Sequence, residues 1–207
     1  MTQKTKLAAI FGGLGVMLAI VIAVGSLMYG VYVKHDESSV TRVFAKAFHF
    51  PAARVGMRTV SYSDFLSTRD AIIKFINSEA GAQVDATMPP DKALNDNIME
   101  RLVRQEMIQE MADDKSIAVS DDDISAVFDD VVKAAASSTT PDVAQYLQDN
   151  YGWSEQDFRQ NVLKPALLEQ KVTTQLGLDP AGNPLDIEAV LAERRVKADV
   201  VVYLKFQ

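Results

Sequence analysis

The stretch that decides the fold is LNDNIMERLVRQEMIQEMADDKSIAVSDDDISAVFDDVV, residues 94–132. Its apolar residues recur every three or four positions, which predicts two helices, at 91–113 and 121–137. Ser120 and Asp123 open the second helix, because a hydroxyl at the N-cap and a carboxylate three residues later can each satisfy a free backbone N–H. The chain is therefore expected to be mainly α-helical.

The first of these helices carries apolar residues in two sectors. At roughly 100° per residue, Leu94, Ile98 and Leu102 share one sector of the helical wheel. The remaining apolar positions drift into another sector: Val103, Met107 and Met111. A helix of this kind is expected to be central, with neighbours on different sides along its length.

Start and stop signals together predict four more helices, at 62–79, 141–150, 155–176 and 186–195. The serine-to-aspartate spacing recurs in two pairs, Ser61–Asp64 and Ser154–Asp157. Thr140 followed by Pro141 is the other form of helix start, a cap and a proline already set at helical φ.

Glycine and proline mark where these helices end or bend. Gly81, Gly152 and Gly177 stand where a helix needs a left-handed residue to stop. Pro165 interrupts the helix at 155–176, where its missing N–H would forfeit the bond to Asn161. That bend is either a static kink or a hinge.

The two ends of the helical body read as strands. The segment from Arg54 to Val60 is short and rich in Val and Thr, with Gly56 permitting a bend or bulge. From Val200 to Phe206 apolar residues alternate, as they do in a strand. A lone strand cannot satisfy its own backbone groups, so we expect these two segments to pair in a small two-stranded sheet.

The N-terminal segment 7–33 contains no charged residue. At about 1.5 Å per residue this helix would span roughly 40 Å, enough to cross the roughly 30 Å hydrocarbon core of a bilayer. We expect an uncleaved transmembrane helix that acts as a signal anchor, with a cleaved secretory signal as the alternative. The short tail 1–6 favours a cytoplasmic N-terminus in a single-pass protein of the cell membrane, with the rest of the chain extracytoplasmic. The positive-inside count is nearly balanced between the two flanks.

Residues 34–52 are expected to form a juxtamembrane amphipathic linker, with the folded domain at 53–207. Within the linker, apolar residues recur at helical spacing with Arg42 and Lys46 between them. This helix either lies on the lipid headgroups or is a spacer that packs on the domain. Pro51 is expected to end it.

The composition leaves little for catalysis. The chain has no cysteine and two histidines, His35 and His49, both beside the predicted span. This excludes thiolate chemistry and a three-histidine zinc site. The run Asp121–Asp123 is explained by helix capping, because it lacks the spaced ligands of a calcium loop. We predict a non-enzyme without metal or cofactor, and the net charge of −7 argues against a nucleic-acid partner.

Three motifs carry a resemblance to a known family. Residues 94–132 resemble the N-terminal chaperone module of SurA-type periplasmic proteins, also present in membrane-anchored PpiD and PrsA relatives. The segment 151–158, YGWSEQDF, and the segment 60–65, VSYSDF, are similar to two further elements of that module. Together the likeness covers roughly 53–207. The entry turn Val55-Gly56-Met57 departs from the usual Val-Asn-Gly, and no parvulin (prolyl-isomerase) domain is recognised.

The resemblance implies a membrane-anchored extracytoplasmic chaperone that assists protein folding by binding unfolded or newly translocated polypeptides in an apolar groove. Membrane lipid, through residues 7–33, and the translocation machinery are further candidate partners. Adaptable apolar side chains suit peptide binding, and the candidates are Met99, Met107, Met111, Phe128 and Trp153. The alternative for these residues is the domain's own core. The alternative function is a non-catalytic adaptor or scaffold for one fixed envelope partner.

Overall fold

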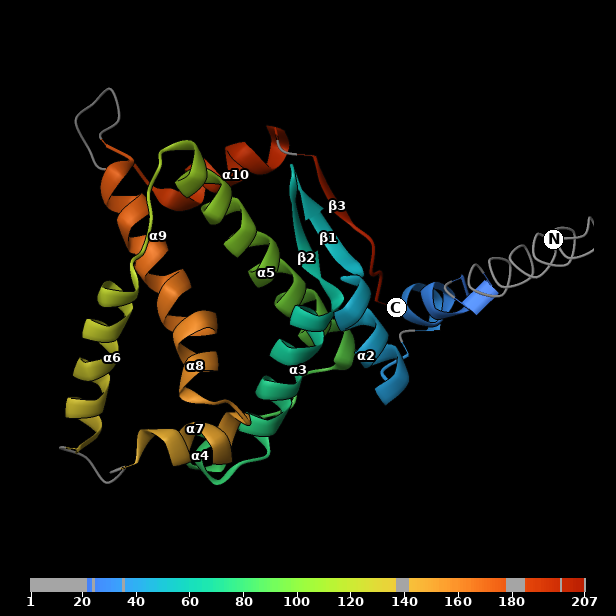
Figure 1. Ribbon diagram of the computed structural model, residues 1–207, viewed down its shortest axis with the longest axis horizontal. Helices are drawn as coiled ribbons and strands as arrows, with labels where there is room; N and C mark the ends of the chain where they lie inside the picture. Colours follow the sequence, from blue (N-terminus) through green and yellow to red (C-terminus); the bar gives the residue numbers. More distant parts are fainter. Residues whose placement is uncertain are drawn as a thin grey trace, which may run out of the picture.

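The computed structural model describes residues 22–23, 25–34, 36–136, 142–177, 185–197 and 199–206. Helices make up most of it, and a small sheet lies at one side of the helical body (Figure 1). In chain order the helices are α2 (Ser39–Phe48), α3 (Tyr62–Ile76), α4 (Glu79–Gln83), α5 (Asp91–Asp114), α6 (Asp121–Ala136), α7 (Val143–Tyr151), α8 (Glu155–Phe158), the π-helical turn η1 (Arg159–Leu163), α9 (Lys164–Gln175) and α10 (Ile187–Lys197). The predicted mainly α class is confirmed.

The sheet has three strands, so the prediction of two was wrong. The strands are β1 (Pro51–Val55), β2 (Arg58–Ser61) and β3 (Val200–Val202), antiparallel in the order β2-β1-β3. The segment 54–60 is a hairpin because Gly56, at φ 55°, turns the chain back on itself. The predicted pairing of the first and last segments is confirmed between β1 and β3, where Val55 faces Val200.

α5 is the central helix, as its two apolar sectors predicted. It contacts α3, α9 and α10 as well as strands β1 and β2. In Figure 1 it runs through the middle of the body, between the sheet and α9. The main hydrophobic core forms around it and includes Leu94, Ile98 and Val103.

Two predicted helix signals are corrected by the structure. Gly81 lies inside α4, and Asn77 ends α3. A Cβ on Gly81 would lie 2.2 Å from the carbonyl oxygen of Phe75, so glycine allows α4 to approach the end of α3. Asp142 is the N-cap of α7, with its carboxylate accepting from the Gln145 N–H at 3.0 Å. Thr140 and Pro141 lie outside the described residues.

The interruption at Pro165 takes the form of a change in helix type. The η1 turn comes directly before α9, and the Lys164 N–H donates to the carbonyl of Arg159, five residues back. Pro165 then occupies the first turn of α9, where a missing N–H is tolerated. A π turn therefore absorbs the proline within the continuous helical run.

α6 is held by a smaller core of its own. Ile124 and Phe128 pack on Leu163 of η1. At the start of α6, Lys171 of α9 donates to the Asp123 carboxylate at 2.7 Å. In Figure 1 this helix lies on the far side of α9 from α5.

At the N-terminal end, the helical segment 25–34 precedes α2, and its last turns join the body. Val31 is fully buried in the main core. Among the described residues we find no helix that combines the length and the apolar character needed to cross a bilayer. The tail 1–6 and most of the predicted span 7–33 lie outside those residues, so the span stays a prediction.

Candidate functional site

The structure places four of the five predicted peptide-binding residues in the interior. Met99, Met107 and Met111 belong to the main core around α5, with Met107 only 3% exposed. Phe128 is buried in the core of α6. They pack the protein's own interior, which was the alternative that the sequence left open. Trp153 alone reaches the surface, where it is half-buried.

Trp153 lines a pocket of about 360 Å³ between α2, α3 and the end of α7. Leu66 and Ala71 are the buried aliphatic members of its lining. Ser63 and Ser67 add hydroxyl groups from the same face of α3. The pocket therefore combines apolar contact area with hydrogen-bonding groups.

An aromatic column positions Trp153. Its ring stacks on Tyr151 at 5.4 Å between centroids, and Tyr151 stacks on Phe75 of α3 at 5.0 Å. Gly152, at φ 71°, ends α7 as predicted and turns the chain so that the tryptophan follows directly. Burial raises the pKa of the Tyr151 phenol above its ordinary value, so the ring is neutral at physiological pH. The column offers a flat apolar surface that is fixed by stacking.

Charged side chains surround this aromatic surface. Arg42 of α2 binds Asp70 of α3 through two hydrogen bonds, of 2.5 and 3.2 Å, and this pair raises the pKa of Arg42. Lys74 donates to the carbonyl of Gln148 near the end of α7. Lys46 also lines the pocket, and no acidic side chain described by the structure lies within ion-pair distance of it. The rim can therefore attract an acidic side chain or a peptide carbonyl.

No sequence motif predicts that these residues form one pocket. Arg42 and Lys46 stood out only as polar residues of an amphipathic helix. Asp70 and Lys74 lie on α3, and their spacing carries no motif. Tyr151 was noted as part of a motif and not as a binding residue. Only the packing of α2 and α7 on α3 brings them together.

α2 also has a second exposed surface, on its side away from the body. Val40, Val43, Phe44, Ala47 and Phe48 are all exposed. The rings of Phe44 and Phe48 stack at 5.8 Å with an interplanar angle of 2°. Phe48 in turn stacks on the buried Phe50 at 6.3 Å. We call this set of five residues the outer face of α2.

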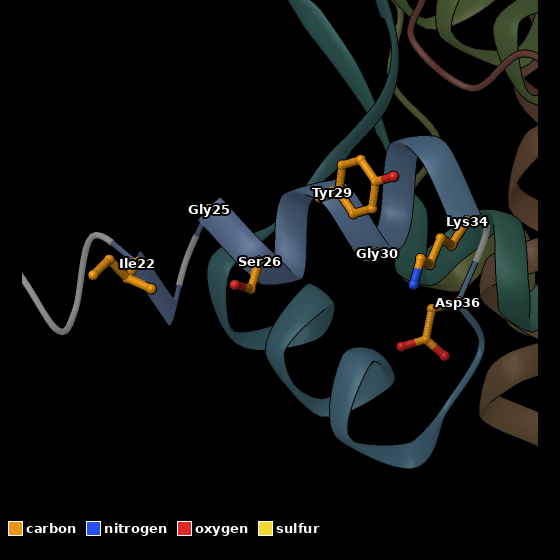
Figure 2. Close-up of a pocket in the computed structure, with 7 residues that line it drawn as sticks. All are labelled: Ile22, Gly25, Ser26, Tyr29, Gly30, Lys34 and Asp36. Carbon is orange, nitrogen blue, oxygen red and sulfur yellow. The ribbon is translucent and has the colours of Figure 1, made fainter.

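A hollow of about 620 Å³ lies beside the N-terminal helical segment, as Figure 2 shows. Its lining consists of Ile22, Gly25, Ser26, Tyr29, Gly30, Lys34 and Asp36. Hydrogen bonds from Thr41 and Ser38 lower the pKa of Asp36. The Lys34 ammonium lies 5.8 Å from the centroid of the Tyr29 ring. Since Asp36 is already engaged in capping α2, the hollow has few polar groups left to hold a ligand.

In the part of the chain that the structure describes, no three His, Asp or Glu side chains are grouped to hold a metal ion. Asp123, from the predicted capping run, caps α6 by accepting the Ser120 N–H at 2.9 Å, and its pKa is lowered chiefly by the bond from Lys171. The Asp123 carboxylate therefore acts in capping and ion pairing.

A family model described as the SurA-like N-terminal domain matches residues 2–173. The chain therefore belongs to the family of SurA-like N-terminal domains, a chaperone-type, non-catalytic class of domain whose members in general bind client polypeptides. The match includes the apolar segment 7–33 and ends before α10 and β3, so it begins and ends earlier than the likeness seen in the sequence. No curated protein and no solved structure matches the chain.

Proposed function

We propose that this protein is a membrane-anchored extracytoplasmic chaperone that binds unfolded or newly translocated polypeptides at the Trp153 pocket. Membership of the SurA-like family is the observation that carries this proposal. Residues 7–33 would be the anchor, with the tail 1–6 in the cytoplasm and the folded body outside, near the translocation machinery. Binding would need no nucleotide, metal or covalent step.

The pocket supports this function by its size and chemistry. About 360 Å³ accepts one or two apolar side chains of a client. The stacked Tyr151 and Trp153 rings offer contact area at low entropic cost, because the column already fixes them. Lys46 and the serine hydroxyls can meet client carbonyl groups without selecting one sequence. This combination favours weak binding of many clients over tight binding of one ligand.

The alternative is an adaptor for one fixed envelope partner. Burial of Met99, Met107 and Met111 favours it, because those adaptable side chains are not on the surface. The two functions differ in whether the protein binds an unrelated unfolded chain.

The test is aggregation of an unrelated, chemically denatured protein diluted into the full chain held in lipid nanodiscs. A chaperone suppresses aggregation at near-stoichiometric ratios, and empty nanodiscs do not. Trp153→Ala should weaken client binding about tenfold, as loss of a central aromatic contact does. Trp153→Phe should restore most of the binding. Met57→Ala, on the fully exposed hairpin tip, is the matched control and should have no effect.

Lys46→Glu separates loss of binding from loss of folding. Lys46 is exposed and forms no ion pair with any residue that the structure describes, so its replacement should leave the helical circular dichroism unchanged. We expect weaker suppression for acidic clients only. If the wild-type chain does not slow aggregation at a several-fold excess, the adaptor is the better assignment.

A further inference from the structure

α2 is an amphipathic helix of which the body covers only one part. On a helical wheel of roughly 100° per residue, the outer face occupies a continuous sector. Thr41 and Ala45, in the adjoining sector, are buried against the body, and Arg42 and Lys46 follow them. Val43 is 66% and Phe48 56% exposed. This apolar sector of a ten-residue helix is therefore largely exposed, and Phe48 touches the body through its stack on Phe50.

Both ends of α2 are fastened to the end of the N-terminal helical segment. Before α2, the Asp36 N–H donates to the carbonyl of Gly30 at 2.9 Å. After it, the Tyr32 hydroxyl donates to the carbonyl of Pro51 at 2.9 Å. Val31, between these two anchoring residues, is fully buried in the main core. These two hydrogen bonds therefore hold α2 beside the point where residues 30–32 join the body.

This attachment fixes where α2 lies relative to a bilayer. Residues 30–32 are the outer end of the proposed anchor 7–33. In Figure 1, α2 lies at the end of the body from which the N-terminal helix leaves. Because α2 is tied to that end on both sides, it must lie at the membrane surface whenever the anchor spans the membrane.

The charges near α2 suit a headgroup layer better than a protein partner. Segment 34–49 holds three Lys or Arg residues and two acidic residues in a chain of net charge −7. Asp36 is engaged by Ser38 and Thr41, and Glu37 is paired with Arg69. Lys46 remains on the edge of the outer face. A basic edge beside an apolar aromatic sector is the pattern of helices that lie in the membrane interface.

We propose that α2 lies on the bilayer that the chain's own anchor crosses, with Val43, Phe44 and Phe48 inserted at the boundary between headgroups and acyl chains. This inference rests on the proposed anchor. It gives the body a fixed orientation on the membrane, with α2 as a second point of attachment. The Trp153 pocket, which shares Arg42 and Lys46 with α2, then opens close to the lipid surface.

Single-cysteine labelling tests the orientation, because the chain has no cysteine of its own. An environment-sensitive fluorophore is attached to Val43→Cys in the full chain, reconstituted in vesicles of phosphatidylethanolamine and phosphatidylglycerol. Val196→Cys on α10 is the matched control, since Val196 is 89% exposed and α10 is remote from α2 in Figure 1. Ala19→Cys reports on the anchor itself.

We expect quenching of the Val43→Cys label by lipids brominated on their acyl chains, and iodide quenching about fivefold weaker than at Val196→Cys. Equal iodide quenching at the two positions would overturn the proposal. Protection of Val43→Cys from both quenchers would also overturn it, because a protein would then cover the outer face. In either case, quenching of Ala19→Cys by brominated lipid leaves the anchor standing and rejects the α2 contact alone. If Ala19→Cys is not quenched by lipid, the anchor fails, and the inference fails with it.

Discussion

α5 and α2 are both helices with prominent apolar residues, yet the protein uses them in opposite ways. α5 has neighbours on several sides, and its apolar residues are divided between α3, α9, α10 and the sheet. α2 buries only Thr41 and Ala45 and leaves its widest apolar sector exposed. The helix with the clearer amphipathic pattern is thus the less buried of the two.

The polar residues of the two helices differ in the same way. On α5, Arg104 pairs with Glu169 and Glu188, and Glu100 pairs with Arg195. On α2, Arg42 pairs with Asp70, while Lys46 forms no ion pair with the acidic side chains that the structure describes. Both the apolar and the charged side chains of α5 therefore make contacts within the folded body. α2 leaves its outer face and Lys46 available for contact, as expected of a helix at an interface.

The largest effect is expected from truncating the centre of α5. Ile98 is 2% exposed in the main core, so Ile98→Ala should lower the free energy of unfolding by about 3 kcal/mol through lost burial and a residual cavity. Urea unfolding of the detergent-solubilised chain, followed by the fluorescence of its single tryptophan, measures this. A loss below about 1 kcal/mol would mean that α5 is not the tightly packed centre.

The same chemical change on the two helices sharpens the comparison. Val103→Ala on α5, at 2% exposure, should cost about 2 kcal/mol. Val43→Ala on α2 should alter the free energy of unfolding by less than about 0.5 kcal/mol, since Val43 is 66% exposed. The same unfolding curves give both values. If Val43→Ala lowered the free energy of unfolding as much as Val103→Ala, a segment of the protein would have to cover the outer face.

The smallest effect concerns the charged side of α5 and depends on pH. The hydrogen bond from Arg104 lowers the pKa of Glu169 from 4.5, outweighing the opposing effect of partial burial. The folded state therefore binds fewer protons than the unfolded state between the two pKa values. Its stabilising contribution is present above about pH 4.5 and is lost as pH falls through the lower, folded value.

Glu169→Gln removes this contribution, which solvent exposure limits to about 1 kcal/mol or less. We expect the variant to be less stable than wild type near pH 7 and the difference to shrink near pH 3. The stability difference from urea titrations at the two pH values isolates Glu169 from the other carboxylates. A difference independent of pH would assign the effect to packing.

Much of the fold was predictable because its signals are local. The Ser154–Asp157 box formed with both hydrogen bonds, and Gly152 ended α7 in a left-handed conformation. The pairing of the first and last strands followed from the need to satisfy backbone groups. Gly56 permits the bend that was predicted. The single strand expected over 54–60 and the helix end expected at Gly81 were wrong, because both depend on neighbours: the hairpin partner in one case and the end of α3 in the other.

The candidate site was less predictable, since Trp153 alone was recognised in advance among the residues of its pocket. The methionines illustrate the reason. Their spacing on α5 is compatible with a binding surface or with a core, and periodicity does not record which neighbours cover a face.

By itself, the amino-acid sequence determined the positions of the main helices, the central role of 91–113 and the likeness to the SurA-like family, because caps, turns and periodic apolar residues act within a few positions of one another. Only the tertiary structure decided that Met107 is interior while Phe48 is exposed. It also brought Lys46, Asp70 and Trp153 to one pocket from distant parts of the chain. The physical reason is that a residue is buried only when another part of the chain packs on it, and the sequence of one helix does not specify that partner.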